Sequence, residues 1–180
     1  MTTKPQIKRV RIELLTPEAF DPFGEVFGPQ SGGPSTIAHS GASCFFSAKF
    51  SVNGTTRLAY VTYPYRKAPT EFLSYELEQH LDVTQSMIPL EGKPAIVVVA
   101  PPSPWQSAPD VDKIRAFLLD GTRGVVLNRL TWHSSGLDGT PSVLPLYPPC
   151  VSCVTIHCAE TWDGVIRKTF EGTHLVNLQK

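Results

Sequence analysis

Proline and glycine interrupt this chain so often that few long helices can form. The 180 residues contain 17 prolines and 13 glycines, and the segments between them are short. Many short strands with turn residues at close intervals are typical of an all-β barrel or jelly roll. The sequence therefore predicts an all-β fold with one or two short helices. The length fits a single domain over residues 1–180.

Several segments predict particular elements. Thr16 followed by Pro17 predicts the start of a helix, which must be brief because a proline and a glycine follow at 22 and 24. Residues 95–100 are apolar throughout, which predicts a central strand buried on both faces. The Asn53-Gly54 dipeptide predicts a hairpin between strands at 43–52 and 57–62.

Further strands are expected on both sides of the Glu91-Gly92 turn, at 85–90 and 93–100. A strand at 114–119 ends at Asp120-Gly121, and we expect 124–130 to pair with it. A proline-rich loop follows residue 100, a turn is expected at 138–141, and the last strand should cover 152–158.

The charge of the chain argues against several classes of partner. Sixteen basic residues balance sixteen acidic residues, and no basic stripe or acidic run is present. Nucleic acid and anionic membranes are therefore poor candidates as partners. The longest apolar run, 95–100, is too short to span a bilayer, and no signal peptide is evident. We expect a cytoplasmic protein that acts on a small molecule.

The segment at 72–81 carries the most informative polar side chains. Read as a strand, it sends Leu73, Leu77 and other apolar residues to one face. Glu76, Glu78 and His80 then share the opposite face, where an acid and an imidazole lie about 7 Å apart at two-residue spacing. A helix over 70–81 is the alternative interpretation, because Thr70 can cap it. The alternation favours the strand, although Gln79 interrupts it.

A zinc cluster is a second possibility that the spacing argues against. Cys150, Cys153, His157 and Cys158 are close in sequence, within a β-branched segment typical of a strand. In a strand, Cys153 and His157 lie about 13 Å apart, which is too far to share one ion. We expect reduced, structural cysteines.

Gln85 and Gly92 extend the pattern that begins at Glu78. The spacing of Glu78-x-His80, Gln85 and Gly92 resembles the first cupin motif, in which metal ligands point into a jelly-roll barrel. Here glutamate replaces the first histidine, and glutamine replaces the later glutamate. Because a glutamine carbonyl is a weak ligand for transition metals, this set suits an organic substrate better than a metal. The sequence requires no cofactor, but a divalent metal stays open because cupin barrels often hold one.

Other candidate residues come from later and earlier segments. Trp132-His133 follows the strand that begins at Gly124, so its histidine should lie at a barrel end. Among the cations, either Arg66 or Arg115 could bind a substrate carboxylate through a bidentate fork.

Taken together, these segments resemble the ureidoglycolate lyase family, also called ureidoglycolate hydrolase. The resemblance runs from residue 15 to about residue 156, and its sharpest segments are Glu76-Leu-Glu-Gln-His80, Gln85-Ser-Met-Ile-Pro-Leu90 and Trp132-His133. It implies a cupin-like jelly-roll β-barrel, commonly a homodimer. That family splits ureidoglycolate into glyoxylate and urea, late in allantoin degradation.

The resemblance and the chemistry of this cleavage suggest a role for each candidate. We expect His80 and His133 to transfer protons, Glu78 to orient one imidazole or act as a base, and Gln85 to hold the substrate. The expected substrate-binding residues are Arg66, which would bind the carboxylate, and Glu76, Trp132 and His157.

Two differences from the family pattern bear on the substrate. Ser134-Ser135 follows Trp132-His133 where the family usually has His-Pro, and His157 stands where the late strand usually ends in aspartate. Two alternatives therefore stay open. One is another lyase or isomerase reaction on a specialised metabolite, and the other is a non-catalytic sensor of a small carboxylate.

Overall fold

The computed structural model describes residues 6–29, 47–65, 73–74, 76–134, 143–158, 165–169 and 174–179, and the structural statements below refer to these residues. Nearly all of its regular structure is strand. The first half contains β1 (Gln6–Leu14), α1 (Pro17–Phe20), β2 (Gly24–Phe27), β3 (Thr56–Pro64), β4 (Leu73–Ser74), β5 (Glu76–His80) and β6 (Gln85–Pro89). The second half contains β7 (Ala95–Ala100), a 3-10 helix η1 (Val111–Lys113), β8 (Arg115–Leu119), β9 (Gly124–Leu127), β10 (Trp132–Ser134), β11 (Leu144–Pro145), β12 (Cys150–Cys158), β13 (Val165–Thr169) and β14 (His174–Gln179).

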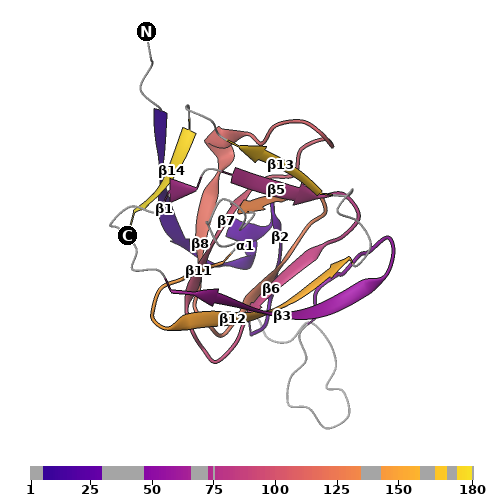
Figure 1. Ribbon diagram of the computed structural model, residues 1–180, viewed down its shortest axis with the longest axis vertical. Coiled ribbons are helices and arrows are strands. Elements are labelled where there is room, and N and C mark those ends of the chain that lie inside the picture. Colours follow the sequence, from indigo (N-terminus) through magenta and orange to yellow (C-terminus); the bar gives the residue numbers. More distant parts are fainter. Residues whose placement is uncertain are drawn as a thin grey trace.

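These strands form two sheets that enclose a common core (Figure 1). The larger sheet has the order β13-β5-β10-β7-β8-β1-β14-β4, with β11 paired to β7. The smaller sheet has the order β2-β9-β6-β12-β3. Neighbouring strands are antiparallel except where β1 runs parallel to β14 and to β8. This arrangement confirms the predicted all-β, cupin-like fold. None of the described helices is long and apolar enough to cross a membrane.

The core lies between the two sheets, where apolar side chains from both inner faces meet. Val97, Val99 and Phe117 come from the larger sheet, and Met87, Val125 and other residues come from the smaller one. A second apolar cluster covers the opposite face of the larger sheet; it includes Leu77, Ile96, Val98, Ala100 and Trp132. Because each face of β7 contacts one of these clusters, the whole strand is buried, as predicted for residues 95–100.

Helix α1 closes one side of the core. The side-chain oxygen of Thr16 accepts a hydrogen bond from the Ala19 N–H at 3.2 Å, which confirms the predicted cap. Phe20 is fully buried, and its ring lies 5.7 Å from that of Phe23 and 5.2 Å from that of Phe117. The helix is short, and this aromatic packing holds it in place.

The prediction of a hairpin at Asn53-Gly54 is wrong. Residues 47–51 form no strand, and β3 pairs along all nine of its residues with β12. Gly54 does bend the chain, with a φ of 116°. However, the segment before it turns toward the end of β5: Val52 forms a bridge with Val83, and the Asn53 N–H donates to the Asp82 carbonyl. Strand β3 therefore pairs with β12, a long strand rich in β-branched residues, and not with residues 43–52 as the turn signal predicted.

The predicted pairing of residues 124–130 with 114–119 is also wrong. Strand β9 pairs with β2 and β6 in the smaller sheet, whereas β8 is flanked by β7 and β1 in the larger sheet. Gly121, with a φ of 88°, lets the chain leave one sheet for the other. A Cβ atom at Gly24 would lie 2.0 Å from the Val126 carbonyl oxygen, so β2 can approach β9 only with glycine at this position.

Candidate active site

Two crossings between the sheets bring the predicted residues of β5, β6 and β10 to the same end of the molecule. After His80, residues 81–84 cross from β5 to β6, which begins at Gln85. Gln85 pairs with Leu127, and residues 128–131 then cross back to β10, where His133 pairs with Glu78. This pairing confirms that Glu76–His80, in the segment predicted at 72–81, is a strand rather than a helix.

The two crossings are hydrogen-bonded to each other. The Leu130 N–H donates to the His80 carbonyl at 2.8 Å, and Arg129 Nε donates to the Leu81 carbonyl at 2.6 Å. From the other face of β5, the buried Gln79 amide donates to the Leu130 carbonyl at 3.0 Å. Gln79 therefore interrupts the alternating pattern because its side chain holds the second crossing in place.

A carboxylate and two imidazoles converge on the inner face of the larger sheet. Oε1 of Glu78 lies 3.3 Å from Nε2 of His133 and 3.6 Å from Nε2 of His80. The two rings are stacked, with centroids 5.2 Å apart and planes inclined by 24°. Glu78 and His133 are buried, whereas the His80 side chain keeps 17% of its surface exposed. His80 is thus the imidazole of this pair that solvent or a small molecule can reach.

The histidines keep Glu78 ionised despite its burial. Burial acts to raise the pKa of the Glu78 carboxyl, but the hydrogen bonds and charge interactions with His133 and His80 outweigh it and lower the pKa to about 2. At neutral pH the cluster therefore contains a carboxylate between two imidazoles.

Both ring nitrogens of His133 face acceptor oxygens. Nδ1 lies 3.3 Å from the Thr131 carbonyl oxygen, and Nε2 faces the Glu78 carboxylate. Both partners are acceptors, but a neutral imidazole carries only one N–H. A neutral ring therefore donates to one of these two oxygens at a time.

Glu78, His80 and His133 also suit a divalent metal ion. They are the one set of three or more His, Cys, Asp or Glu side chains in the described ranges whose ligand atoms converge, all within 4.8 Å of one another. Histidine ligands of metals commonly donate their other ring nitrogen to a carbonyl group, as Nδ1 of His133 does to Thr131. The residues present therefore fit such an ion.

Gln85 extends from the smaller sheet, on the inner face. It pairs with Leu127 and alternates with Met87, and both of these belong to the core between the sheets. Its Oε1 atom is buried and has no hydrogen-bond partner among the residues that the structure describes. The amide can therefore accept a hydrogen bond from a bound molecule.

Among the remaining predicted residues, Glu76 and Trp132 are not part of this cluster. Glu76 is half-buried at the start of β5, and its carboxylate is not among the converging ligand atoms. Trp132 lies on the opposite face of the larger sheet, packs in the cluster that contains Leu77, and donates from Nε1 to Ser103 Oγ at 2.7 Å. The backbone of His157 pairs with Arg57 in β12. The side chain of His157 and the whole of Arg66 lie outside the described residues, as does the turn expected at 138–141.

Cys150 and Cys153 of β12 have the expected structural character. Cys150 and Cys153 are free thiols, and Cys153 packs in the core between the sheets. Burial raises the pKa of the Cys153 thiol to about 12, so it is not a thiolate at neutral pH.

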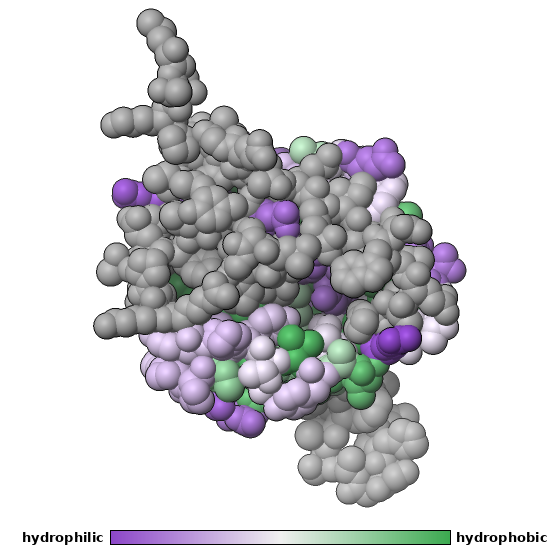
Figure 2. Space-filling view, in the orientation of Figure 1, coloured by the Kyte–Doolittle hydropathy of each residue, from purple (hydrophilic) through white to green (hydrophobic). Residues whose placement is uncertain are grey.

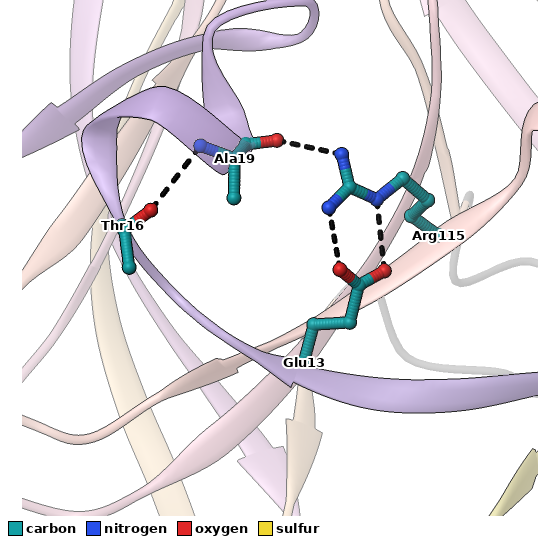
Figure 3. Close-up of polar contacts among 4 residues, drawn as sticks. All are labelled: Glu13, Thr16, Ala19 and Arg115. Atoms are coloured by element: carbon teal, nitrogen blue, oxygen red, sulfur yellow. Dashed lines mark hydrogen bonds and ion pairs between the residues drawn. The ribbon is translucent and has the colours of Figure 1, made fainter.

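Arg115, the other candidate cation, has a structural partner in the Glu13 carboxylate. Its guanidinium forms a bidentate pair with Glu13, donating from Nε to Oε1 at 2.8 Å and from Nη2 to Oε2 (Figure 3). Nη1 donates to the Ala19 carbonyl at 2.8 Å, and the guanidinium stacks 4.8 Å from the centroid of the Phe117 ring. Arg115 thus ties β1, α1 and β8 together.

Replacing Arg115 with methionine is expected to lower the free energy of unfolding by about 1–2 kcal/mol, because partly exposed charged hydrogen bonds contribute about this much. Urea denaturation measures this loss. The control is Arg123→Met, which removes a pair with Asp120 that is local in sequence. Unchanged stability together with a raised KM would instead give Arg115 a role in binding substrate.

A family model described as ureidoglycolate lyase matches residues 7–138, which include β5, β6 and β10. The chain belongs to the ureidoglycolate lyase family. It is 33% identical to the ureidoglycolate lyase of Azotobacter vinelandii over 125 residues, covering 68% of this chain and 73% of that protein. It is 34% identical to that of Pseudomonas aeruginosa over 139 residues, covering 71% and 75%. The resemblance inferred from the motifs is thereby confirmed.

Sequence patterns only partly indicated the residues that support the cluster. Gln79 stood out as a polar residue in an apolar position, but its partner, the Leu130 carbonyl, is 51 residues away. Thr131 acts through its backbone carbonyl, which no side-chain pattern reveals.

Proposed function

We propose that this protein is a lyase that cleaves ureidoglycolate to glyoxylate and urea. The observation that carries the proposal is the buried carboxylate of Glu78, which lies between the imidazoles of His80 and His133 in a member of the ureidoglycolate lyase family. Breaking the carbon–nitrogen bond of a carbinolamide needs one group that accepts a proton and one that donates a proton. Two imidazoles beside one carboxylate can supply both.

The reaction follows from the groups present. A base removes the proton of the substrate hydroxyl, the C–O bond becomes the carbonyl of glyoxylate, and the C–N bond breaks. The departing urea nitrogen receives a proton from an acid. We assign these two proton transfers to His80 and His133, and we assign Glu78 to fixing the rings and stabilising the imidazolium form. Because His80 is the more exposed ring, it is our candidate for direct contact with the substrate.

Gln85 supports the same proposal from the smaller sheet. Its buried amide oxygen is available to accept a hydrogen bond from substrate N–H or O–H groups. If a divalent ion is bound, Glu78, His80 and His133 would hold it, and it would supply a Lewis acid for the oxygens of the substrate.

The decisive experiment supplies racemic ureidoglycolate to the purified protein and measures glyoxylate and urea. We expect the two products in equal amounts, with a rate that saturates with substrate. If the substrate raises the melting temperature without being consumed, the protein is a sensor of small carboxylates and the proposal is wrong.

A cytoplasmic location and a homodimer are also part of the proposal. Leu58 and Tyr60 of β3 are 71% and 63% exposed, and Figure 2 shows hydrophobic residues at the surface over β12 and β3. Exposed apolar residues on a sheet face suit contact with a second copy of the chain. Sedimentation velocity tests this point, and a monomer at every concentration would refute the dimer.

A further inference from the structure

Within the described ranges, the inner face of the smaller sheet contains another polar atom without a hydrogen-bond partner, in addition to the Gln85 amide oxygen. The Thr155 hydroxyl is buried in β12 and makes no hydrogen bond to any described residue. The residue is only 8% exposed. Because a buried hydroxyl without a partner destabilises the folded state, such a group in a native fold calls for an explanation.

The pairing of β12 directs this hydroxyl into the space between the sheets. Thr155 alternates with Val151 and Cys153, and both of these pack in the core between the sheets. Its partner in β3 is Ala59, which alternates with Tyr63, another residue packed against that core. Side chains that alternate along one strand share a face, so Thr155 points toward the larger sheet.

Thr155 also lies toward the end of the molecule that contains the cluster. Only six residues separate Cys158, the last residue of β12, from Val165, which pairs with His80. Figure 1 shows β5 and the second half of β12 running toward the same side of the view. Packed sheets lie about 10 Å apart, which leaves room for a small molecule between polar groups on the two inner faces.

We propose that Thr155 is a substrate-binding residue whose hydroxyl hydrogen-bonds the ureido group, opposite Glu78, His80 and His133. A hydroxyl can accept from a ureido N–H and donate to a ureido carbonyl, whereas a carboxylate is better bound by a cation. Thr155 and Gln85 are both neutral and therefore suit the neutral end of the molecule. This inference rests on the proposed function, and the family match, which ends at residue 138, assigns nothing to β12.

The test replaces Thr155 with valine, which has nearly the same shape but no hydroxyl. If the hydroxyl serves the substrate alone, Thr155→Val keeps or raises the melting temperature of the free protein, because an unpaired polar group is removed. The same change raises KM about tenfold with little change in kcat, as expected for a contact made equally with substrate and transition state. Thr155→Ser, which restores the hydroxyl, recovers most of the lost affinity.

Thr62→Val is the matched control. The Thr62 hydroxyl lies on the exposed face of β3 and contacts Ser152 Oγ at 3.2 Å, so this substitution should leave KM unchanged. An unchanged KM in Thr155→Val overturns the inference. A lower melting temperature together with a fall in kcat also overturns it, because that result indicates a structural role.

Binding of oxalurate separates this inference from the proposed reaction. Oxalurate contains the same carboxylate and ureido groups but has no carbinol carbon, so it cannot undergo this elimination. If the wild type binds oxalurate but does not cleave ureidoglycolate, the proposed function fails. The role of Thr155 is then judged by calorimetry, with about tenfold weaker binding expected in Thr155→Val. Equal binding by both proteins, or no binding by the wild type, overturns the inference.

Discussion

Replacing Glu78 with glutamine is expected to lower kcat for ureidoglycolate cleavage by at least about 100-fold. The carboxylate oxygen faces Nε2 of His133 at 3.3 Å and Nε2 of His80 at 3.6 Å. An amide of the same size carries no charge, so it cannot stabilise an imidazolium that forms during proton transfer. It can also turn its NH₂ group toward the rings and so favour the wrong tautomer. Steady-state measurement of glyoxylate release gives the fall in kcat.

The pH dependence of stability gives an independent measure of the same contact. The pKa of Glu78 falls from 4.5 to about 2 on folding, so its ionised form stabilises the folded state above pH 4.5. That contribution disappears as the pH falls through the folded pKa. The difference in unfolding free energy between wild type and Glu78→Gln should therefore shrink as the pH falls from 4.5 to about 2. Glu91→Gln, which changes an exposed pair with Lys93, is the control. Activity of Glu78→Gln within tenfold of wild type would contradict the assignment.

Local patterns predicted the elements whose sequence determines both their conformation and their burial. Thr16 and Pro17 define the start of α1, and the apolar run at 95–100 forms a strand buried on both faces. In each case the residues that decide the outcome are adjacent in the chain. The Asn53-Gly54 turn signal was equally local but failed, because the nine-residue pairing of β3 with β12 outweighs it. Strand pairing depends on distant segments, and a single sequence does not contain that information in a readable form.

The candidate site shows the same division. Glu78 and His80 were predictable because they alternate on one strand, and His133 was identified from the Trp132-His133 pair. Trp132, its neighbour, points the opposite way because adjacent residues of a strand occupy opposite faces. Thr155 offered no signal, since a threonine in a β-branched strand is ordinary. Only the three-dimensional structure reveals that its hydroxyl has no hydrogen-bond partner in the part of the chain that is described.

The crossings between the sheets explain why the polar groups gather at one end. Residues 81–84 and 128–131 are connections of four residues each, which is enough to pass between packed sheets. The hydrogen bond from the Leu130 N–H to the His80 carbonyl joins the second connection to the end of β5, and the bond from Arg129 Nε to the Leu81 carbonyl joins the two connections. Rigid attachment of this kind keeps the imidazoles in a fixed relation, which acid–base chemistry requires.

Each of the single variants His80→Ala and His133→Ala should have a kcat at least about 100-fold below that of the wild type, because general acid–base catalysis contributes this much or more. The stacked rings share the Glu78 carboxylate, so we expect them to act as a unit. The double variant should then lose about as much activity as the more impaired single variant, since groups that act together are not additive. Single-turnover measurements of glyoxylate formation test this relation.

The buried position of His133 calls for a second variant, because alanine there leaves a cavity that itself lowers stability. His133→Asn keeps a side-chain amide that can donate to the Thr131 carbonyl, as Nδ1 does in the wild type, but it cannot transfer a proton. It should therefore fold with a melting temperature closer to wild type and still lack turnover. Near-normal rates in a folded His80→Ala or His133→Asn variant would refute the proton-transfer pair. A double variant whose loss is the product of the single losses would show instead that the two histidines act independently.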